Sequence, residues 1–210
     1  SPIPNPQSPI PNLQSPISNP PPMTILDHFG ILAPLYDRIF KPVEQEWLWK
    51  LLDLPVSGAL LDAGGGTGRI SQFMRDKAAP VVVADLSCEM LRQANAKVGL
   101  QTTCSHTEKL PFSDATFERV IMVDALHHVC NQAETARELW RILKPGGRLV
   151  IEEPDVRTFA VKILAVAEKL ALMRSHFLAP PKIAALFPYP NARTSIERDG
   201  YISWVVVEKA

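Results

Sequence analysis

A glycine-rich segment is the first feature of the sequence that could do chemistry. It reads DAGGGTG over residues 62–68 and follows an apolar run. Glycines at such a place let the backbone approach a ligand closely and adopt positive φ. The dinucleotide pattern G-x-G-x-x-G does not fit, because its third glycine would fall on Arg69 or Ser71, and no lysine follows for a phosphate loop. The frame that fits is D-x-G-x-G-x-G, with Asp62 at the end of a strand.

A second carboxylate, Asp85, ends the next expected strand, 80–84. A carboxylate there can accept hydrogen bonds from both ribose hydroxyls of a nucleoside. Asp85 could instead begin a helix, since Ser87 follows it closely, and the glycine segment could be a tight turn that binds nothing. A turn that binds nothing would be more stable with better helix formers than glycine in it. Four glycines within 64–68 therefore favour a ligand site over such a turn. Together the two features indicate a nucleoside site.

The elements around these residues alternate between strands and helices. Strands are expected at the apolar run before Asp62 and at 80–84, 101–104, 118–123, 148–152, 192–198 and 201–208. Helices are expected at 43–53, 69–77, 87–97, 132–143 and 157–175, and a short helical region broken at Pro34 is expected within 24–40. The alternation predicts an α/β fold with a doubly wound, mostly parallel, seven-stranded sheet covered on both faces. Asp199-Gly200 predicts a C-terminal hairpin, which would add an antiparallel edge to the sheet.

The proline content differs between two parts of the chain. Nine of the 20 prolines fall in residues 1–22, where SPIPNPQ, SPIPNLQ and SPISNPP repeat one another. Proline cannot enter a helix interior, so the repeat is expected to be extended or disordered, with a ligand for an SH3-like groove as the alternative. Residues 23–210 have ordinary proline usage and predict one domain, with Met23 as a candidate start.

Charge, hydropathy and cysteine spacing exclude several classes of protein. With 22 basic and 22 acidic residues the net charge is zero, which predicts no binding to nucleic acid. No apolar run reaches the ~18 residues of a membrane-spanning helix. Cys88, Cys104 and Cys130 lack CxxC spacing and are odd in number, so neither a disulfide scaffold nor a zinc site is expected, and a reducing compartment fits. These features, without a basic signal-peptide region, predict a cytoplasmic protein.

Four stretches resemble the class I S-adenosylmethionine-dependent methyltransferases, especially the small-molecule branch that includes ubiquinone and menaquinone enzymes. They are LLDAGGGTGRIS at 60–71, VVADLSCEML at 82–91, EKLPFSDATFERVIMVDALHHV at 108–129 and LWRILKPGGRLVIEEP at 139–154. They are similar to the family's cofactor loop, ribose-binding strand end, adenine loop with fourth strand, and turn into the fifth strand. The resemblance implies a Rossmann-like methyltransferase fold, S-adenosylmethionine as cofactor and S-adenosylhomocysteine as product.

The resemblance also implies which residues hold the cofactor. The glycine segment would hold its methionine part, Asp85 its ribose, Leu86 its adenine face and Asp124 its methionyl amine, while Tyr36 would cover it. The residues so assigned are Tyr36, Asp62, Gly64, Gly65, Gly66, Asp85, Leu86, His106, Thr107, Glu108 and Asp124. In the adenine loop the family commonly has an acid at the place of His106.

Two adjacent histidines follow Asp124 on the side where a methyl acceptor is expected. His127 or His128 could take a proton from a phenol or enol during methylation, or both could be structural loop residues. Adjacent residues point in different directions, which disfavours a metal ion held by both. The expected reaction is methyl transfer to a small apolar, phenol-like or quinol-like molecule by a monomer or homodimer. The alternatives are an NAD(P)-dependent oxidoreductase on a similar scaffold and a non-catalytic cofactor-binding protein.

The residues after Glu153 are expected to determine which methyl acceptor binds. An apolar face within 157–175 is expected to pack onto the sheet as a helix. Aromatic side chains then gather in a proline-rich connection, 174–190, at His176, Phe177, Phe187 and Tyr189. They could line an apolar pocket or form a latch that closes the domain.

Overall fold

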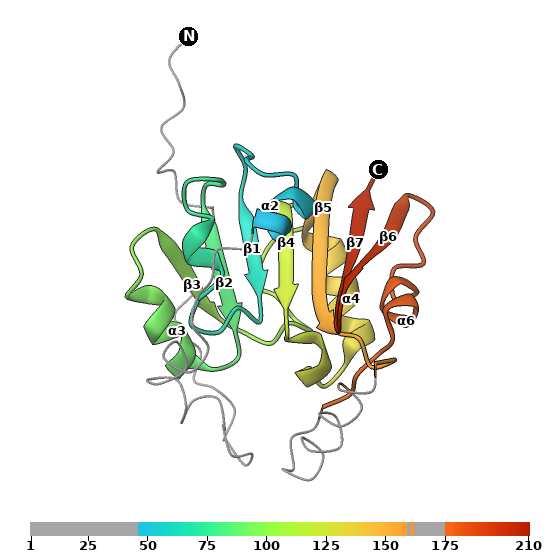
Figure 1. Cartoon of the computed structure of the whole chain (residues 1–210). Helices are drawn as coiled ribbons and strands as arrows, with labels where there is room; N and C mark the ends of the chain where they lie inside the picture. Colours follow the sequence, from blue (N-terminus) through green and yellow to red (C-terminus); the bar gives the residue numbers. More distant parts are fainter. Residues whose placement is uncertain (1–45, 159–160, 162–174) are drawn as a thin grey trace.

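The computed structural model of the chain describes residues 46–158, 161 and 175–210 (Figure 1). The proline-rich repeat, the expected helical region 24–40 with Tyr36, and most of the expected helix 157–175 lie outside the described residues. The division of the chain into 1–22 and 23–210 therefore stays a prediction.

Seven strands form one sheet in the order β3-β2-β1-β4-β5-β7-β6. The strands are β1 Leu60–Ala63, β2 Val81–Asp85, β3 Leu100–Cys104, β4 Phe117–Val123, β5 Leu143–Pro154, β6 Ala192–Asp199 and β7 Ile202–Lys209. The first five run parallel, whereas β7 is antiparallel to β5 and β6 is antiparallel to β7. The predicted α/β fold is confirmed, including its antiparallel C-terminal hairpin. The strand order reverses between β1 and β4, which is where ligands bind in open α/β sheets.

Helices cover both faces of this sheet, as Figure 1 shows. They are α2 Glu46–Leu51, α3 Cys88–Asn95, α4 Gln132–Ile142 and α6 Pro180–Ala184, with 3₁₀ turns η1 Ser71–Phe73 and η2 Leu126–His128. Alternate side chains of one strand serve the two faces: Leu61 packs in the core under α4 and α6, and Leu60 packs in the core under α2, η1 and α3. All four residues of β1 are buried, as expected for a strand covered on both sides. Within the described part of the chain, no helix is both long enough and apolar enough to cross a membrane.

The prediction of a helix over 69–77 is wrong. Its helical part is the 3₁₀ turn η1, in which the N–H groups of Phe73 and Met74 donate to the carbonyl oxygens three residues earlier. A 3₁₀ turn is tighter than an α-helical turn. It begins at Ser71, whose buried hydroxyl donates to the Asp62 carboxylate at the end of β1. The segment after the glycines is therefore shaped by its contact with β1.

Two other turns were expected, at 145–147 and at Asp199-Gly200, and glycines with positive φ lie at both places. In β5 the pairing with β4 passes from Leu143 opposite Phe117 to Arg148 opposite Arg119, so the expected turn at 145–147 is an irregularity inside a longer strand. Gly146 has φ of +74° at that place, a conformation that favours glycine. In the hairpin, Gly200 has φ of +56° directly after β6, which confirms the predicted turn.

Phe117→Ala should lower the free energy of unfolding by about 3–4 kcal/mol. Phe117 is fully buried at the start of β4 and packs edge-on against Phe112, with ring centroids 4.9 Å apart. Urea denaturation of the full chain measures the loss. Val98→Ala, at a side chain that is 83% exposed, is the control and should change stability by less than about 0.5 kcal/mol. Equal effects of the two substitutions would contradict this packing.

Candidate functional site

Asp62 is a buried carboxylate at the end of β1. The residue is 2% exposed, its Oδ2 accepts a hydrogen bond from the Ser71 hydroxyl, and its Oδ1 has no hydrogen-bond partner in the described part of the chain. Burial raises the pKa of Asp62 to about 6, opposed by the Ser71 hydrogen bond and reinforced by the charge of Asp85. Leaving a buried acceptor unpaired is unfavourable. Asp62 is therefore suited to receive a polar, cationic ligand group.

The glycines beside Asp62 form a closely packed turn at the ends of β1 and β2, which we call the cradle. Gly64 has φ of +73°, and a Cβ there would lie 2.6 Å from the Ala125 Cβ beyond β4. A Cβ on Gly65 would lie 2.5 Å from Cγ of Asp62. Gly66 has φ of +55°, and its nearest neighbour would be Asp85 Oδ2 at 4.0 Å. A side chain at Gly66 would thus be strained and would stand beside the Asp85 carboxylate.

Asp85, at the end of β2, is oriented by two backbone groups. The Gly66 N–H donates to Oδ2 at 2.9 Å, and the Ser87 N–H donates to Oδ1 at 2.7 Å. A carboxylate can accept several hydrogen bonds, so a residue of this type suits the ribose hydroxyls that are expected here. The adjoining Leu86 is 55% exposed, which suits an apolar surface against an aromatic base. The structure thus brings Asp62, the glycines, Asp85 and Leu86 to neighbouring strand ends.

The expected adenine loop is tied to the start of α4. Thr107 is buried, with its hydroxyl 3.1 Å from that of Thr135, and Oε1 of Glu108 accepts the N–H groups of Cys130 and Asn131. These side chains therefore have partners within the protein. His106 carries the exposed side chain of this stretch, with Nδ1 3.9 Å from Oε2 of Glu108. Its contact with an adenine remains a prediction.

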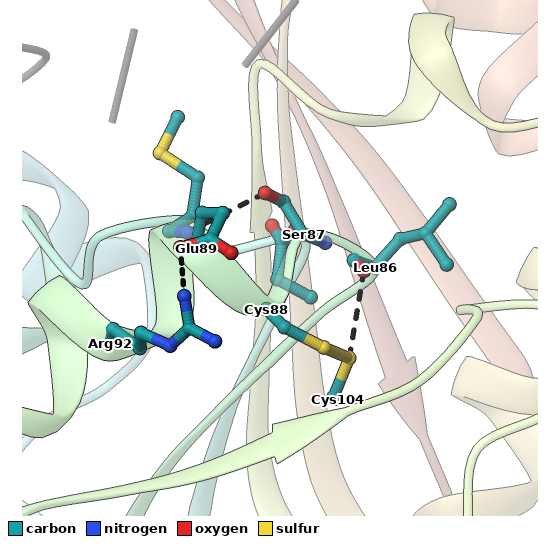
Figure 2. Close-up of a disulfide and its surroundings, with 8 residues drawn as sticks. Leu86, Ser87, Cys88, Glu89, Arg92 and Cys104 are labelled. Carbon is teal, nitrogen blue, oxygen red and sulfur yellow. Dashed lines mark hydrogen bonds and ion pairs between the residues drawn. A yellow bond between two sulfur atoms is a disulfide. The ribbon is translucent and has the colours of Figure 1, made fainter. Parts of the chain in front are cut away.

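Cys88 and Cys104 form a disulfide (Figure 2), although the number and spacing of the cysteines predicted no disulfide scaffold and favoured a reducing compartment. Cys88 begins α3, and Cys104 ends β3 as the register partner of Asp85. Because β2 and β3 pair in parallel, the two Cα atoms lie 5.7 Å apart despite 16 residues of sequence separation. Cys104 Sγ lies 3.5 Å from the carbonyl oxygen of Leu86. The bridge ties the two chain segments that flank the expected ribose and adenine positions.

Asp124 directly follows β4 and adopts φ of +51°, a left-handed conformation uncommon outside glycine. Its N–H donates to the carbonyl oxygen of Glu152, and its Oδ2 lies 3.7 Å from a guanidinium nitrogen of Arg69. Glu152 is buried on β5 and accepts a hydrogen bond from Trp204 Nε1 at 2.5 Å. Burial raises the pKa of Glu152 to about 7, opposed by the Trp204 hydrogen bond and reinforced by Asp124. Arg69 and Asp124 thus join the glycine segment to the end of β4.

The two histidines of η2 have different surroundings. His127 is 5% exposed, and its Nδ1 lies 2.6 Å from Oε2 of Glu153 at the end of β5. His128 Nδ1 lies 3.4 Å from the hydroxyl of Ser175. Burial, with the charge of His127, lowers the pKa of His128 to about 3. His128 is therefore neutral at physiological pH and a weak base.

The aromatic residues on either side of α6 have different contacts. Phe187 is 4% exposed and belongs to the core, and Tyr189 stacks on Trp140 of α4 with ring centroids 4.5 Å apart. Phe177 differs, since its ring stacks on His127 at 4.3 Å. Of the two roles expected for this segment, the described contacts favour the latch for Phe187 and Tyr189 and bring Phe177 to the histidines.

Several residues of this site were missed by sequence reasoning. They are Arg69, Ser71, Glu152 and Glu153. The two glutamates had a signal, because adjacent acids at the end of an expected parallel strand lie at the ligand-binding edge of the sheet. Among the residues described by the structure, no group of three or more His, Cys, Asp or Glu side chains could hold a metal ion.

Comparison with known proteins identifies the family of this arrangement. Residues 61–151 match the family model described as "Methyltransferase domain". The chain is 36% identical over 121 residues to "Ubiquinone/menaquinone biosynthesis C-methyltransferase UbiE" of Pseudomonas paraeruginosa, a match that covers 50% of this chain and 47% of that protein. The protein of the same name from Cronobacter sakazakii is 32% identical over 121 residues, 50% of this chain and 48% of that one. The chain thus spans about half the length of these relatives.

Solved structures support the fold. A SAM-dependent methyltransferase of Thermotoga maritima has a TM-score of 0.70 at 19% identity, covering 87% of this chain and 98% of that one. A SAM-dependent methyltransferase of Aquifex aeolicus has a TM-score of 0.64 at 18% identity, covering 87% of this chain and 97% of that one. At these identities the likeness concerns the fold.

Thiol titration of the unreduced, denatured chain should find one reactive cysteine. The structure pairs Cys88 with Cys104 and leaves Cys130 free and exposed. Cys130→Ser should leave no reactive thiol, and Cys88→Ser should expose Cys104 as a second one. Three reactive thiols in the wild-type chain, purified without reductant, would contradict the disulfide.

Affinity for S-adenosylmethionine should rise about tenfold between about pH 5 and pH 7.5. The pKa of Asp62 is about 6 without ligand, so the carboxyl is mostly protonated at the lower pH. A cationic amine binds the ionised form better, and binding therefore releases a proton and strengthens until the pH passes that pKa. Calorimetric titration across this range measures the effect.

Asp62→Asn should remove most of this pH dependence. Asp76→Asn is the control, because the Asp76 side chain is 78% exposed, and it should preserve the dependence. Wild-type affinity that stays constant across the range would rule out Asp62 as the titrating contact.

Proposed function

The chain belongs to the class I S-adenosylmethionine-dependent methyltransferases, and from that premise we propose that it transfers the methyl group of S-adenosylmethionine to a small phenol-like or quinol-like acceptor. The observation that carries the proposal is the pair of carboxylates at adjoining strand ends. Asp62 offers a buried, unpaired Oδ1, and Asp85 is held by the N–H groups of Gly66 and Ser87.

S-adenosylmethionine fits the residues of this cradle. Asp62 would receive the cationic methionyl amine, Asp85 the ribose hydroxyls and Leu86 the adenine face, with Asp124 near the amine from the side of β4. When bound, the cofactor supplies a methyl group already activated on a sulfonium. The protein then has to align the acceptor, hold its proton and exclude water.

The proposed acceptor class rests on what surrounds the ends of β4 and β5. Two imidazoles and the Phe177 ring lie together there, with centroids 4.0 Å apart for His127 and His128 and 4.3 Å for His127 and Phe177. Such a surface suits a flat aromatic molecule with an ionisable hydroxyl. The names of the Pseudomonas and Cronobacter relatives place those proteins in quinone biosynthesis, which supports the same class.

Neither alternative from the sequence has a specific observation in its favour. An NAD(P)-dependent oxidoreductase would use the G-x-G-x-x-G frame that this glycine segment lacks. A non-catalytic cofactor-binding protein would need no partner for a proton, yet a histidine is held against a buried carboxylate beside the expected acceptor position.

Gly66→Ala should weaken binding of S-adenosylmethionine by at least about tenfold and lower methylation of phenols and quinols in parallel. The new methyl group would stand beside the Asp85 carboxylate, at φ of +55°. The measurements are calorimetry with the full chain and transfer of radiolabelled methyl groups to a panel of phenols, quinols and carboxylic acids.

Gly146→Ala is the matched control. Gly146 also has a positive φ, +74°, and open space around its Cβ position, but it lies before the regular part of β5, at the opposite end of the parallel strands. It should cost stability and leave cofactor affinity unchanged. If no member of the panel is methylated although S-adenosylmethionine binds, the acceptor class is wrong.

A further inference from the structure

The Cys88–Cys104 disulfide lies beside the carboxylate that is expected to hold the ribose. Cys88 begins α3 three residues after Asp85, which ends β2. On the neighbouring strand, Cys104 is the register partner of Asp85, and the Ser105 N–H donates to the Asp85 carbonyl oxygen at 2.9 Å. Strand pairing and the disulfide together therefore close residues 85–88 into a short loop between β2, β3 and α3 (Figure 2).

This loop carries the residues expected to contact the nucleoside. The Ser87 N–H donates to the Asp85 carboxylate, and the exposed Leu86 side chain is expected against the adenine. The carbonyl oxygen of Leu86 lies 3.5 Å from Cys104 Sγ, so the backbone of the loop is in contact with the disulfide. The Ser87 hydroxyl accepts the Met90 N–H and caps α3. The loop is thus fixed by strand pairing at one end and by the disulfide at the other.

Opening the disulfide would remove the covalent link between the loop and β3. The loop would then have more conformations, and a nucleoside that needs one of them would bind at a greater cost in conformational entropy. The disulfide is also within reach of a reductant, because Cys104 is exposed and Cys88 is half-buried. The two oxidation states therefore differ at the place where the cofactor is expected to bind, as a switch requires.

We propose that the Cys88–Cys104 disulfide regulates the cofactor site, and that its reduction by a dithiol weakens binding of S-adenosylmethionine by about tenfold. This inference rests on the proposed function and deepens it, because it names a way in which the same site is regulated. Coupling between two equilibria is reciprocal, so bound cofactor should make the disulfide about tenfold harder to reduce.

The reduction is a thiol–disulfide exchange with a dithiol reductant. A thiolate of the reductant forms a bond to the exposed Cys104 Sγ, and the sulfur–sulfur bond breaks with its electron pair going to Cys88 Sγ. The position of Cys88 at the start of a helix stabilises the departing thiolate. The second thiol of the reductant then displaces Cys104. The two protons of the reductant end on the two cysteines, and the reductant becomes a disulfide.

Calorimetry with S-adenosylhomocysteine tests the proposal on the full chain. Cys130→Ser leaves the two bridging cysteines as the only ones in the chain. The oxidised form of this variant should bind about tenfold more tightly than the form reduced with dithiothreitol. The matched control adds Cys88→Ser and Cys104→Ser, which remove the disulfide. This control should bind as the reduced form does, whether dithiothreitol is present or not.

Three results would overturn the proposal. They are equal affinities of the oxidised and reduced forms, an effect of dithiothreitol on the control that lacks the disulfide, and loss of the folded circular dichroism spectrum on reduction. The last result would assign the disulfide to stability of the whole domain. Failure of the proposed function is distinguishable, since S-adenosylhomocysteine would then bind neither form.

The reduction equilibrium supplies the reciprocal measurement. The Cys130→Ser chain is equilibrated with mixtures of reduced and oxidised dithiothreitol, and its free thiols are counted. A concentration of S-adenosylhomocysteine that saturates both forms should raise the ratio of reduced to oxidised dithiothreitol needed for half-reduction about tenfold. Adenosine should raise this ratio too, because the disulfide borders the expected nucleoside position. A ratio that stays unchanged although S-adenosylhomocysteine binds would contradict the coupling.

Discussion

The hydrogen bond from the Gly66 N–H to Asp85 is the contact on which the site depends. It joins the loop after β1 to the carboxylate at the end of β2, and the Ser87 N–H holds the other oxygen of that carboxylate at the start of α3. The bond requires the glycine segment to turn back with positive φ at Gly64 and Gly66. Because β1 and β2 are parallel neighbours, their carboxylates reach the same edge of the sheet. The cradle is thus a consequence of strand pairing.

The sheet also places the two acidic residues at the end of β5 in different surroundings. Glu152 and Glu153 are adjacent on β5, so their side chains lie on opposite faces. Glu152 meets Trp204 on the face covered by α2, and Glu153 meets His127 at η2. Two similar residues therefore have separate surroundings, one a buried acid beside an indole and the other a carboxylate against an imidazole.

The sequence predicts the strands and the ends of strands well. Apolar runs, Asp-Gly in the hairpin and the D-x-G-x-G-x-G segment are local signals, and they predict the sheet, its antiparallel edge and the positions of Asp62 and Asp85. The helix expected at 69–77 fails because its first turn follows a tertiary contact between Ser71 and Asp62.

Contacts between distant segments could not be predicted from local signals. The Cys88–Cys104 disulfide depends on the register that places Cys104 opposite Asp85, and an odd number of cysteines does not prevent one pair from forming. The Glu153–His127 contact depends on the pairing of β4 with β5, which brings residues 26 positions apart within hydrogen-bond distance. Thr107 and Glu108 likewise find their partners at the start of α4.

A crystal structure of the full chain with S-adenosylhomocysteine tests the central claim most directly. The account predicts the ribose hydroxyls on the Asp85 carboxylate, the homocysteine amine at Oδ1 of Asp62, and the Gly66 N–H still bonded to Asp85. A nucleoside bound elsewhere, or one whose ribose makes no contact with Asp85, would contradict it.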